Sequence, residues 1–187
     1  MRIVFAAVVA ASVSGVVRAE PLNYDYGYLS RQKMHVDGES FSNDTLGAYK
    51  ELGERMHVFG SYGNAGAYGN PAWKHSRALR VGLGGHWLVG EDTMIALEGA
   101  VVRAQFERPT GETVRDTGAV VIVEMRHRFA PWVEAIASAS RSDVLGREEH
   151  EFVAGPVFHI NSMFALGALY RRTGDSSGFD LTLRTYY

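Results

Sequence analysis

The last nine residues of the sequence read Phe179-Asp180-Leu181-Thr182-Leu183-Arg184-Thr185-Tyr186-Tyr187. Successive side chains of a β-strand point to opposite faces, so Phe179, Leu181, Leu183, Thr185 and Tyr187 share one face. The other face carries both charges of the stretch. In a transmembrane barrel the apolar face of such a strand meets lipid and the polar face meets the lumen. A strand of a soluble β-sandwich alternates in the same way, so this stretch alone leaves both architectures open.

The same stretch resembles the C-terminal assembly signal of Gram-negative outer-membrane β-barrels, a final aromatic residue with hydrophobic residues at every second position before it. Tyr187, Leu183, Leu181 and Phe179 match this pattern, and Thr185 stands where such signals often carry a larger residue. The chain as a whole resembles the small outer-membrane barrels of the OmpX/Ail and OmpW types and the barrel part of OmpA-like proteins. The resemblance implies a porin-like barrel at the cell surface, surrounded by outer-membrane lipids and assembled by periplasmic chaperones and the barrel-assembly machinery.

The first 19 residues have the pattern of a cleaved signal peptide. Arg2 supplies a positive charge, residues 3–17 are mostly apolar, and Val17-Arg18-Ala19 is a cleavage site of the A-x-A kind. A transmembrane helix needs about 20 apolar residues, and this run is shorter and interrupted by serine and glycine. We therefore expect a signal peptide over residues 1–19 and an outer-membrane barrel domain over residues 20–187.

The composition narrows the classes of partner and cofactor. The 19 basic and 21 acidic residues give a net charge of −2, which does not suggest a nucleic-acid partner. The chain has no cysteine, and a closed sheet with every backbone group paired does not need a disulfide. After the signal peptide the longest continuous apolar run is Ala119–Val123. Any membrane contact is therefore expected from strands.

The remaining chain divides into short alternating segments separated by Gly, Asn, Asp, Ser and Pro, and ten of these are candidate strands. Their approximate ranges are 22–31, 40–50, 56–62, 76–87, 93–106, 117–129, 133–140, 152–160, 164–170 and 179–187. Pro156 lies in the middle of the eighth, and proline belongs at an edge or bulge of a sheet. The pattern predicts an all-β, antiparallel up-and-down transmembrane barrel of ten strands, or of eight if the second or eighth has been misassigned.

The expected connections alternate in length. They are short after every even strand, as at Leu52-Gly53-Glu54 and Asn161-Ser162. They are longer and polar at Gly63–Lys74, Glu107–Asp116 and Ser142–Glu151. Short periplasmic turns with longer outer loops are typical of outer-membrane barrels. We therefore expect these three segments to be extracellular loops and the place where a surface ligand would bind.

Charged side chains gather on the faces predicted to point inward. A basic residue facing lipid at mid-depth costs roughly 2–4 kcal/mol, which supports this orientation. The predicted lumen network consists of Arg80, His86, Glu98, Glu124, Arg126, Arg128, Glu134, Asp180 and Arg184. It has two interpretations, because side chains of a small barrel can fill its interior as a plug or can line a narrow ion-selective pore.

No catalytic, cofactor or metal motif is visible. The seven histidines show no ligand spacing, and His150 among Glu148, Glu149 and Glu151 is typical of a solvated acidic loop. His75-Ser76, Ser138 and Ser140 supply residue types of a lipid-modifying enzyme, but no triad pattern accompanies them. Ten aromatic residues near predicted strand ends are interpreted as a membrane girdle: Tyr24, Tyr26, Tyr28, Tyr49, Trp87, Phe129, Trp132, Phe164, Tyr170 and Tyr187.

Three functions remain at this stage. The first is a non-enzymatic outer-membrane barrel, structural or surface-interactive through its extracellular loops, with the lumen largely plugged by charged side chains. The second is a narrow channel for ions or small solutes. The third is an enzyme at the barrel rim that modifies lipid. We expect the first, with no cofactor.

Overall fold

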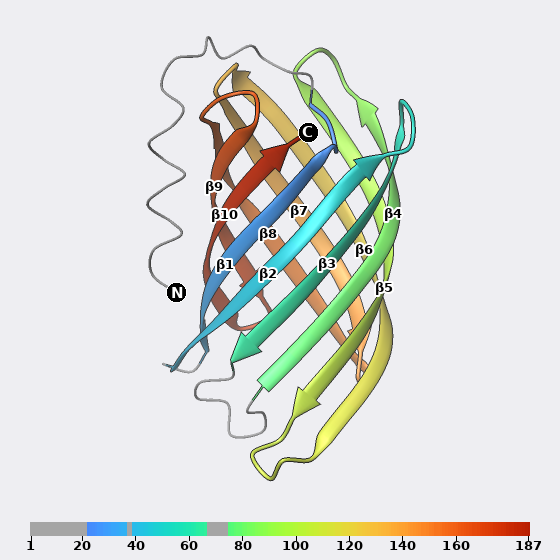
Figure 1. Cartoon of the computed structure of the whole chain (residues 1–187), viewed down its shortest axis with the longest axis vertical. Coiled ribbons are helices and arrows are strands. Elements are labelled where there is room, and N and C mark those ends of the chain that lie inside the picture. Colours follow the sequence, from blue (N-terminus) through green and yellow to red (C-terminus); the bar gives the residue numbers. More distant parts are fainter. Residues whose placement is uncertain (1–21, 37–38, 67–74) are drawn as a thin grey trace.

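The chain forms a closed antiparallel barrel. The computed structural model describes residues 22–36, 39–66 and 75–187, and the expected signal peptide lies outside them. The described residues form ten strands, each paired with its sequence neighbours, and the first pairs with the last (Figure 1). The strands are β1 (Tyr26–Val36), β2 (Glu39–Glu51), β3 (Met56–Gly66), β4 (His75–Leu88), β5 (Thr93–Glu107), β6 (Thr113–Ala130), β7 (Val133–Val144), β8 (Arg147–His159), β9 (Phe164–Thr173) and β10 (Ser176–Tyr186). The predicted ten-strand up-and-down barrel is confirmed, and the eight-strand alternative is wrong.

Many apolar side chains of the barrel are exposed on its outer wall, and several charged ones are buried inside. In β10, Phe179 and Leu181 are each 65% exposed, whereas Asp180 between them is 4% exposed. In β5 the same alternation leaves Ile95 and Leu97 exposed and Glu98 buried. A water-soluble protein shows the opposite arrangement, so the outer wall is suited to hydrocarbon. Among the described residues no helix is long and apolar enough to cross a membrane.

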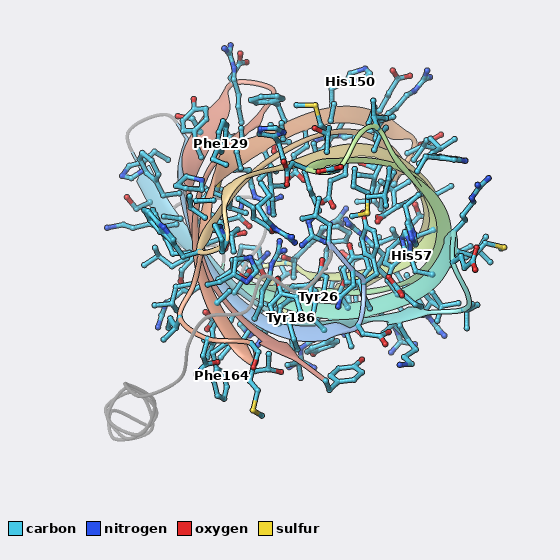
Figure 2. All side chains as sticks on the ribbon, turned by 90° about the horizontal axis from the view of Figure 1, so that it is seen from above. Tyr26, His57, Phe129, His150, Phe164 and Tyr186 are labelled. Carbon is cyan, nitrogen blue, oxygen red and sulfur yellow. The ribbon has the colours of Figure 1, made fainter. Side chains whose placement is uncertain are left out.

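Both ends of the barrel sequence lie at the same end of the barrel. Tyr26 at the start of β1 pairs with Tyr186 at the end of β10, and Figure 1 shows the start of β1 and the end of β10 at the top. We call this end the chain-end rim and the opposite end the far rim. The β5–β6 hairpin projects at the far rim, at the bottom of the same view (Figure 1). Figure 2 shows Tyr26, His57 and Tyr186 inside the wall, and His150 and Phe164 outside it.

The far-rim connections are shorter than the sequence pattern predicted. The strands continue through the polar residues, so the expected loop Glu107–Asp116 is reduced to residues 108–112, and Ser142–Glu151 to Leu145-Gly146. The connection between β9 and β10 is also two residues, Gly174-Asp175. Residues 67–74 of the expected loop Gly63–Lys74 lie outside the described residues. The predicted alternation of short and long loops is therefore wrong for the β7–β8 hairpin, whereas the five-residue β5–β6 connection is still longer than the two- to four-residue connections at the opposite end. Polar residues in both hairpins extend strand pairing instead of ending it.

Two further details of the strand assignment differ from expectation. The first strand begins at Tyr26 rather than Leu22, because Leu22 and Tyr24 turn into the barrel and are buried there. Pro156 does lie within β8, on its outer side. The β8–β9 ladder is interrupted at Gly155 and Pro156, between the pairs Ala154↔Tyr170 and Val157↔Gly167. A barrel has no edge strand, so this local gap accommodates the missing N–H of proline.

Candidate functional site

Side chains fill the barrel near the chain-end rim. They come from strands on all sides and from the segment before β1, and we call this group the plug. Its members are Tyr24, Tyr26, Tyr49, His57, His86, Glu98, Glu124, Arg126, Glu134, His159, Arg184 and Tyr186. They divide into an arginine–glutamate group, a stack of aromatic rings and a histidine pair.

Glu134 of β7 is the centre of the arginine–glutamate group. Its carboxylate accepts hydrogen bonds from Arg126 of β6 at 3.0 and 3.2 Å and from Arg184 of β10 at 3.3 Å. The side chain of Glu134 is fully buried and that of Arg126 is 1% exposed. Removing such charges from water costs several kcal/mol per ion, and mutual attraction offsets this cost only when the geometry is good. The shared carboxylate therefore ties three strands together across the lumen.

The aromatic stack packs against these arginines. The ring of Tyr24 lies parallel to His57 with centroids 3.8 Å apart. The guanidinium of Arg184 is 4.7 Å from the ring centroid of Tyr26, and that of Arg126 is 5.7 Å from it. Cations at such distances are attracted to the face of an aromatic ring. The rings thus occupy the space beside the ion pairs.

The histidine pair joins the plug to the chain-end rim. Nε2 of His57 lies 3.0 Å from Oε1 of Glu98, and Nδ1 of His57 lies 3.3 Å from Nδ1 of His86. In the tautomer of His57 whose Nε2–H donates a hydrogen bond to Glu98, Nδ1 of His57 can only accept, and the hydrogen bond between the two rings is then donated by Nδ1 of His86. The pair fixes the orientation of both rings.

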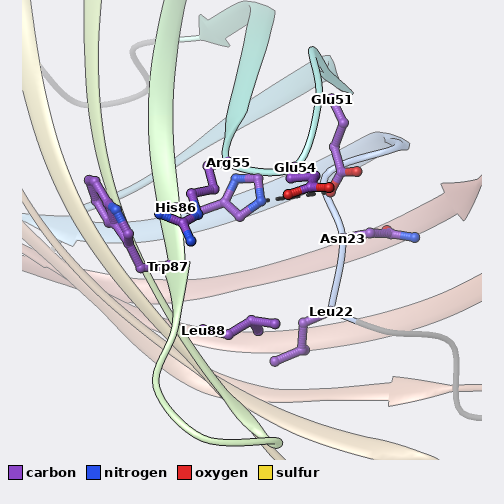
Figure 3. A pocket seen from close by; sticks show the side chains of 8 residues that line it. All are labelled: Leu22, Asn23, Glu51, Glu54, Arg55, His86, Trp87 and Leu88. Carbon is purple, nitrogen blue, oxygen red and sulfur yellow. Dashed lines mark ion pairs between the residues drawn. The ribbon is translucent and has the colours of Figure 1, made fainter.

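A pocket of about 480 Å³ opens between the pair and the rim (Figure 3). It is lined by Leu22, Asn23, Glu51, Glu54, Arg55, His86, Trp87 and Leu88. Nε2 of His86 lies 4.0 Å from Oε1 of Glu51, which is too long for a hydrogen bond. The pocket brings charged and apolar groups together without a nucleophile such as serine or cysteine.

Tyr24 and Asp25 are titratable groups in the described residues before β1. Burial, together with the nearby Glu124 carboxylate, raises the pKa of the Tyr24 hydroxyl well above its ordinary value. The Tyr24 hydroxyl therefore stays protonated and donates to Glu124 at 2.9 Å. Slight desolvation raises the pKa of Asp25, but hydrogen bonds from Lys50 and from the Glu51 N–H outweigh it. The pKa of Asp25 consequently lies below its usual range.

All nine residues of the predicted lumen network lie on the inner side of their strands, but they do not form one network. Among the described residues, Glu134 is the only one of the three network glutamates that pairs with arginine. Glu98 faces His57, and Glu124 accepts from Tyr24. Neither Arg80 nor Arg128 has an ion-pair partner within the described part of the chain. The pattern identified the face of each side chain but not its partner.

Asp180 belongs to a second, separate group. Its carboxylate lies 3.1 Å from Arg171 of β9, and Arg171 also pairs with Glu151 of β8. The sequence reading missed Arg171 and Glu151. The alternation that places Tyr170 outward also places Arg171 inward, so the sequence pattern could have identified Arg171 as a lumen residue.

The aromatic girdle needs correction. Tyr24, Tyr26, Tyr28 and Tyr49 lie inside the barrel, where Tyr26 and Tyr49 stack with ring centroids 4.9 Å apart. Trp87, Phe129, Trp132, Tyr170 and Tyr187 are exposed on the outside as expected. The strand register explains why these tyrosines lie together inside the barrel. Tyr26 pairs directly with Tyr49 and with Tyr186, and residues paired directly across strands share a face.

Among the described residues, the acidic group around His150 does not come together as one cluster. His150 and Glu148 point outward and lie 2.9 Å apart, whereas Glu151 points inward to Arg171. Strand alternation thus divides the acidic cluster between two faces. In the described part of the chain no three His, Cys, Asp or Glu side chains gather as metal ligands. No hydrogen bond joins His75, Ser76, Ser138 or Ser140 to another of these four within the described residues.

Known structures share this fold. No protein-family model and no curated protein matches the sequence. The NanC porin is similar over 85% of this chain and 99% of its own, with 8% identity and a TM-score of 0.53. The KdgM porin in complex with disordered oligogalacturonate covers 90% and 88%, with 7% identity and a TM-score of 0.51. The β domain of the Bordetella autotransporter BrkA covers 87% and 98%, with 12% identity and a TM-score of 0.51. At such identities the likeness shows the fold alone, which is that of outer-membrane β-barrels.

Proposed function

We propose that this protein is a non-enzymatic outer-membrane β-barrel whose lumen is closed by the plug. The observation that carries the proposal is the Arg126–Glu134–Arg184 group, with the Tyr26 ring packed against Arg184. These groups reach across the lumen from β6, β7, β10 and β1. Buried ion pairs break only at high cost, so ordinary thermal motion leaves the closure in place.

The proposal includes the route to the membrane. Residues 1–19 are removed on export, and residues 20–187 form the barrel. The terminal strand, with Phe179, Leu181, Leu183, Thr185 and Tyr187 on its outer face, serves as the signal for the assembly machinery. The chain-end rim then faces the periplasm and the far rim faces the exterior. A structural or surface-interactive role follows, with any recognition at the strand extensions of the far rim.

Planar-bilayer recording tests the closed lumen. We expect purified barrel to carry little or no steady current. The double variant Tyr24→Ala/Tyr26→Ala removes two plug rings and should raise the frequency of open events. Tyr170→Ala, on the outer wall, is the matched control and should not. A large and stable current from the unaltered protein would contradict closure.

A narrow channel is the second candidate. A space of about 90 Å³ lies inside the barrel beside Tyr26, Glu124, Asp180 and Arg184, and the rim pocket lies at the chain-end rim. If these side chains moved, the two spaces could join into a path lined by charges. The fold is also that of the KdgM and NanC porins. Selective current that Glu124→Gln alters would favour this candidate.

Fractionation tests the location. The protein should be found with outer-membrane fractions, and its intact mass should correspond to residues 20–187. Recovery as a soluble periplasmic protein would contradict the proposal. Mass analysis of lipid A from cells with and without the protein tests the enzyme alternative, and we expect no difference.

A further inference from the structure

The outer wall of the barrel changes from apolar to basic towards the far rim. Outward-facing basic side chains near that rim are Arg31, Lys33, Arg77, Arg103, Arg115, Arg141 and Arg172, all exposed. At the chain-end rim the outward-facing Lys50 is already hydrogen-bonded to Asp25 at 2.7 Å. The positive charge of the outer wall is thus concentrated on one side of the apolar band.

Three of these arginines are brought together by strand register. Arg77 of β4 pairs with Gln105 of β5, and Gln105 pairs with Arg115 of β6. Arg103 precedes Gln105 by two residues and points to the same side. Adjacent strands are about 4.8 Å apart, so Arg77 and Arg115 start about 10 Å from each other on either side of Gln105. We call Arg77, Arg103 and Arg115 the β4–β6 arginine cluster.

The cluster has no carboxylate partner among the described residues. The contrast is with Arg31 and Arg141 near the same rim, which pair with Asp44 at 3.6 Å and with Glu148 at 2.6 Å. Glu107 lies one outward position further along β5 than Gln105 and is engaged in an interaction of its own. Like charges at neighbouring positions of one sheet face repel one another, and a bound anion would relieve this repulsion. Guanidinium matches phosphate geometry with two parallel hydrogen bonds.

The position of the cluster selects the kind of anion. Leu79 pairs directly with Arg103, and Val81 pairs with Val101 one row nearer the middle of the wall. These three aliphatic side chains are 50–59% exposed. An anion bound by the arginines therefore sits at the edge of the apolar band. A phosphate attached to acyl chains can contact the arginines and the apolar band at the same time, whereas a free anion contacts only the arginines.

We propose that the β4–β6 arginine cluster is a binding site for a phosphate group of a phosphorylated lipid in the outer leaflet. This inference rests on the proposed insertion in the outer membrane. The arginines hold the phosphate around Gln105, and the acyl chains lie along Leu79, Val81 and Val101. The site also anchors the β5–β6 hairpin at the level of the headgroups.

The test measures lipid A binding to the folded barrel in detergent by native mass spectrometry. The unaltered protein should retain lipid A, and removing the lipid's phosphates should abolish the preference. Each basic side chain near an anionic surface is worth roughly fivefold in affinity. The triple variant Arg77→Gln/Arg103→Gln/Arg115→Gln should therefore bind about a hundredfold more weakly. The matched control Arg31→Gln/Arg141→Gln removes two arginines that already have partners, and should change affinity by less than about threefold.

Several outcomes would overturn the site. Equal binding by the triple variant and the unaltered protein, or equal binding of dephosphorylated lipid A, would do so. Displacement of lipid A by an equal concentration of inorganic phosphate would show a site for a free anion instead. A heat-dependent gel shift establishes that each variant is folded. If even the unaltered chain fails to fold in phosphatidylcholine vesicles, it is the proposed membrane barrel that fails, and not the cluster assignment.

Discussion

Arg126 and Glu134 form a two-point ion pair inside the barrel, with Nη2 of Arg126 3.0 Å from Oε1 and 3.2 Å from Oε2 of Glu134. They are eight residues apart in sequence, on the two strands of one hairpin. Arg184, fifty residues further along the chain, donates to the same Oε1. A local hairpin contact and a long-range contact thus share one carboxylate.

We expect Glu134→Gln to destabilise the barrel by about 3–5 kcal/mol, because it leaves the charges of Arg126 and Arg184 buried without a counter-charge. The matched control is Glu148→Gln, which removes the exposed partner of Arg141 and should cost about 0–1 kcal/mol. Urea unfolding in vesicles, followed by tryptophan fluorescence, compares the two. Equal losses would show that burial of the pair adds nothing.

The two C-terminal tyrosines should respond differently to substitution. The Tyr186 hydroxyl is buried and has no hydrogen-bond partner among the described residues, so Tyr186→Phe should stabilise the barrel by about 1 kcal/mol. Tyr187 is 67% exposed, and its hydroxyl donates to the Tyr49 carbonyl at 2.8 Å. Tyr187→Asp places a charge on the outer wall and should reduce the amount of assembled barrel. Quantification of heat-modifiable protein in outer membranes checks both, and a loss with Tyr186→Phe would contradict the assignment.

The β7–β8 turn contains a strained residue. Leu145 has φ of 59° and Gly146 has φ of 62°, the arrangement of a type I′ turn. Placing a non-glycine residue in this left-handed region of positive φ costs roughly 1–2 kcal/mol, and the cost is lower for asparagine. Leu145→Asn should therefore raise the free energy of unfolding by about 1 kcal/mol, whereas Leu145→Ala should bring no gain. Urea midpoints distinguish these results.

Acid should weaken the contact that holds the segment before β1 to the rim. The folded-state pKa of Asp25 is lowered, so its contribution is complete above the unfolded value near 4 and disappears as pH falls through the lower folded value. Asp25→Asn should remove this part of the acid dependence, so that the free energy of unfolding falls less as the pH is lowered from neutral. Unfolding midpoints from pH 7 to about 2 test the slope. An unchanged slope below pH 4 would contradict the assignment.

Protease should cut the far rim at the turn of residues 108–112 rather than throughout the predicted loops. Arg115 and Arg147 fall within the segments expected to be loops, but they lie in β6 and β8, where paired backbone resists cleavage. Pro109 follows Arg108, so a protease of broad specificity suits the test better than trypsin. Intact cells treated with it should yield fragments ending within 108–112. Cleavage within residues 52–55 or 160–163 instead would contradict this topology and place the chain-end rim at the cell exterior.

The sequence pattern was sufficient for the class of fold and for most side-chain directions. Alternation with period two assigned Leu181 outward and Asp180 inward without any knowledge of neighbouring strands. It also placed Arg126, Glu134 and Arg184 inside. These are local properties of the chain, because each strand carries its own two faces.

Alternation failed where the identity of a partner was needed. It could not show that Glu134 serves Arg126 and Arg184 while Glu98 faces His57, or that Tyr24, Tyr26 and Tyr49 stack inside rather than form a girdle. It also read the polar ends of β7 and β8 as a loop. Whether a polar residue ends a strand or extends it depends on hydrogen bonding with the opposite strand, which composition does not encode.

The sequence by itself therefore determined an up-and-down barrel with an apolar exterior and a charged interior, because each segment has its own two-residue periodicity. Only the tertiary structure decided between eight and ten strands and which charges meet. Closure of β1 on β10 and the register of each pair bring Arg184 to Glu134 and align Arg77, Gln105 and Arg115 in one row. Those distances depend on how whole strands slide against each other, and a shift of two residues would preserve every face while changing every partner.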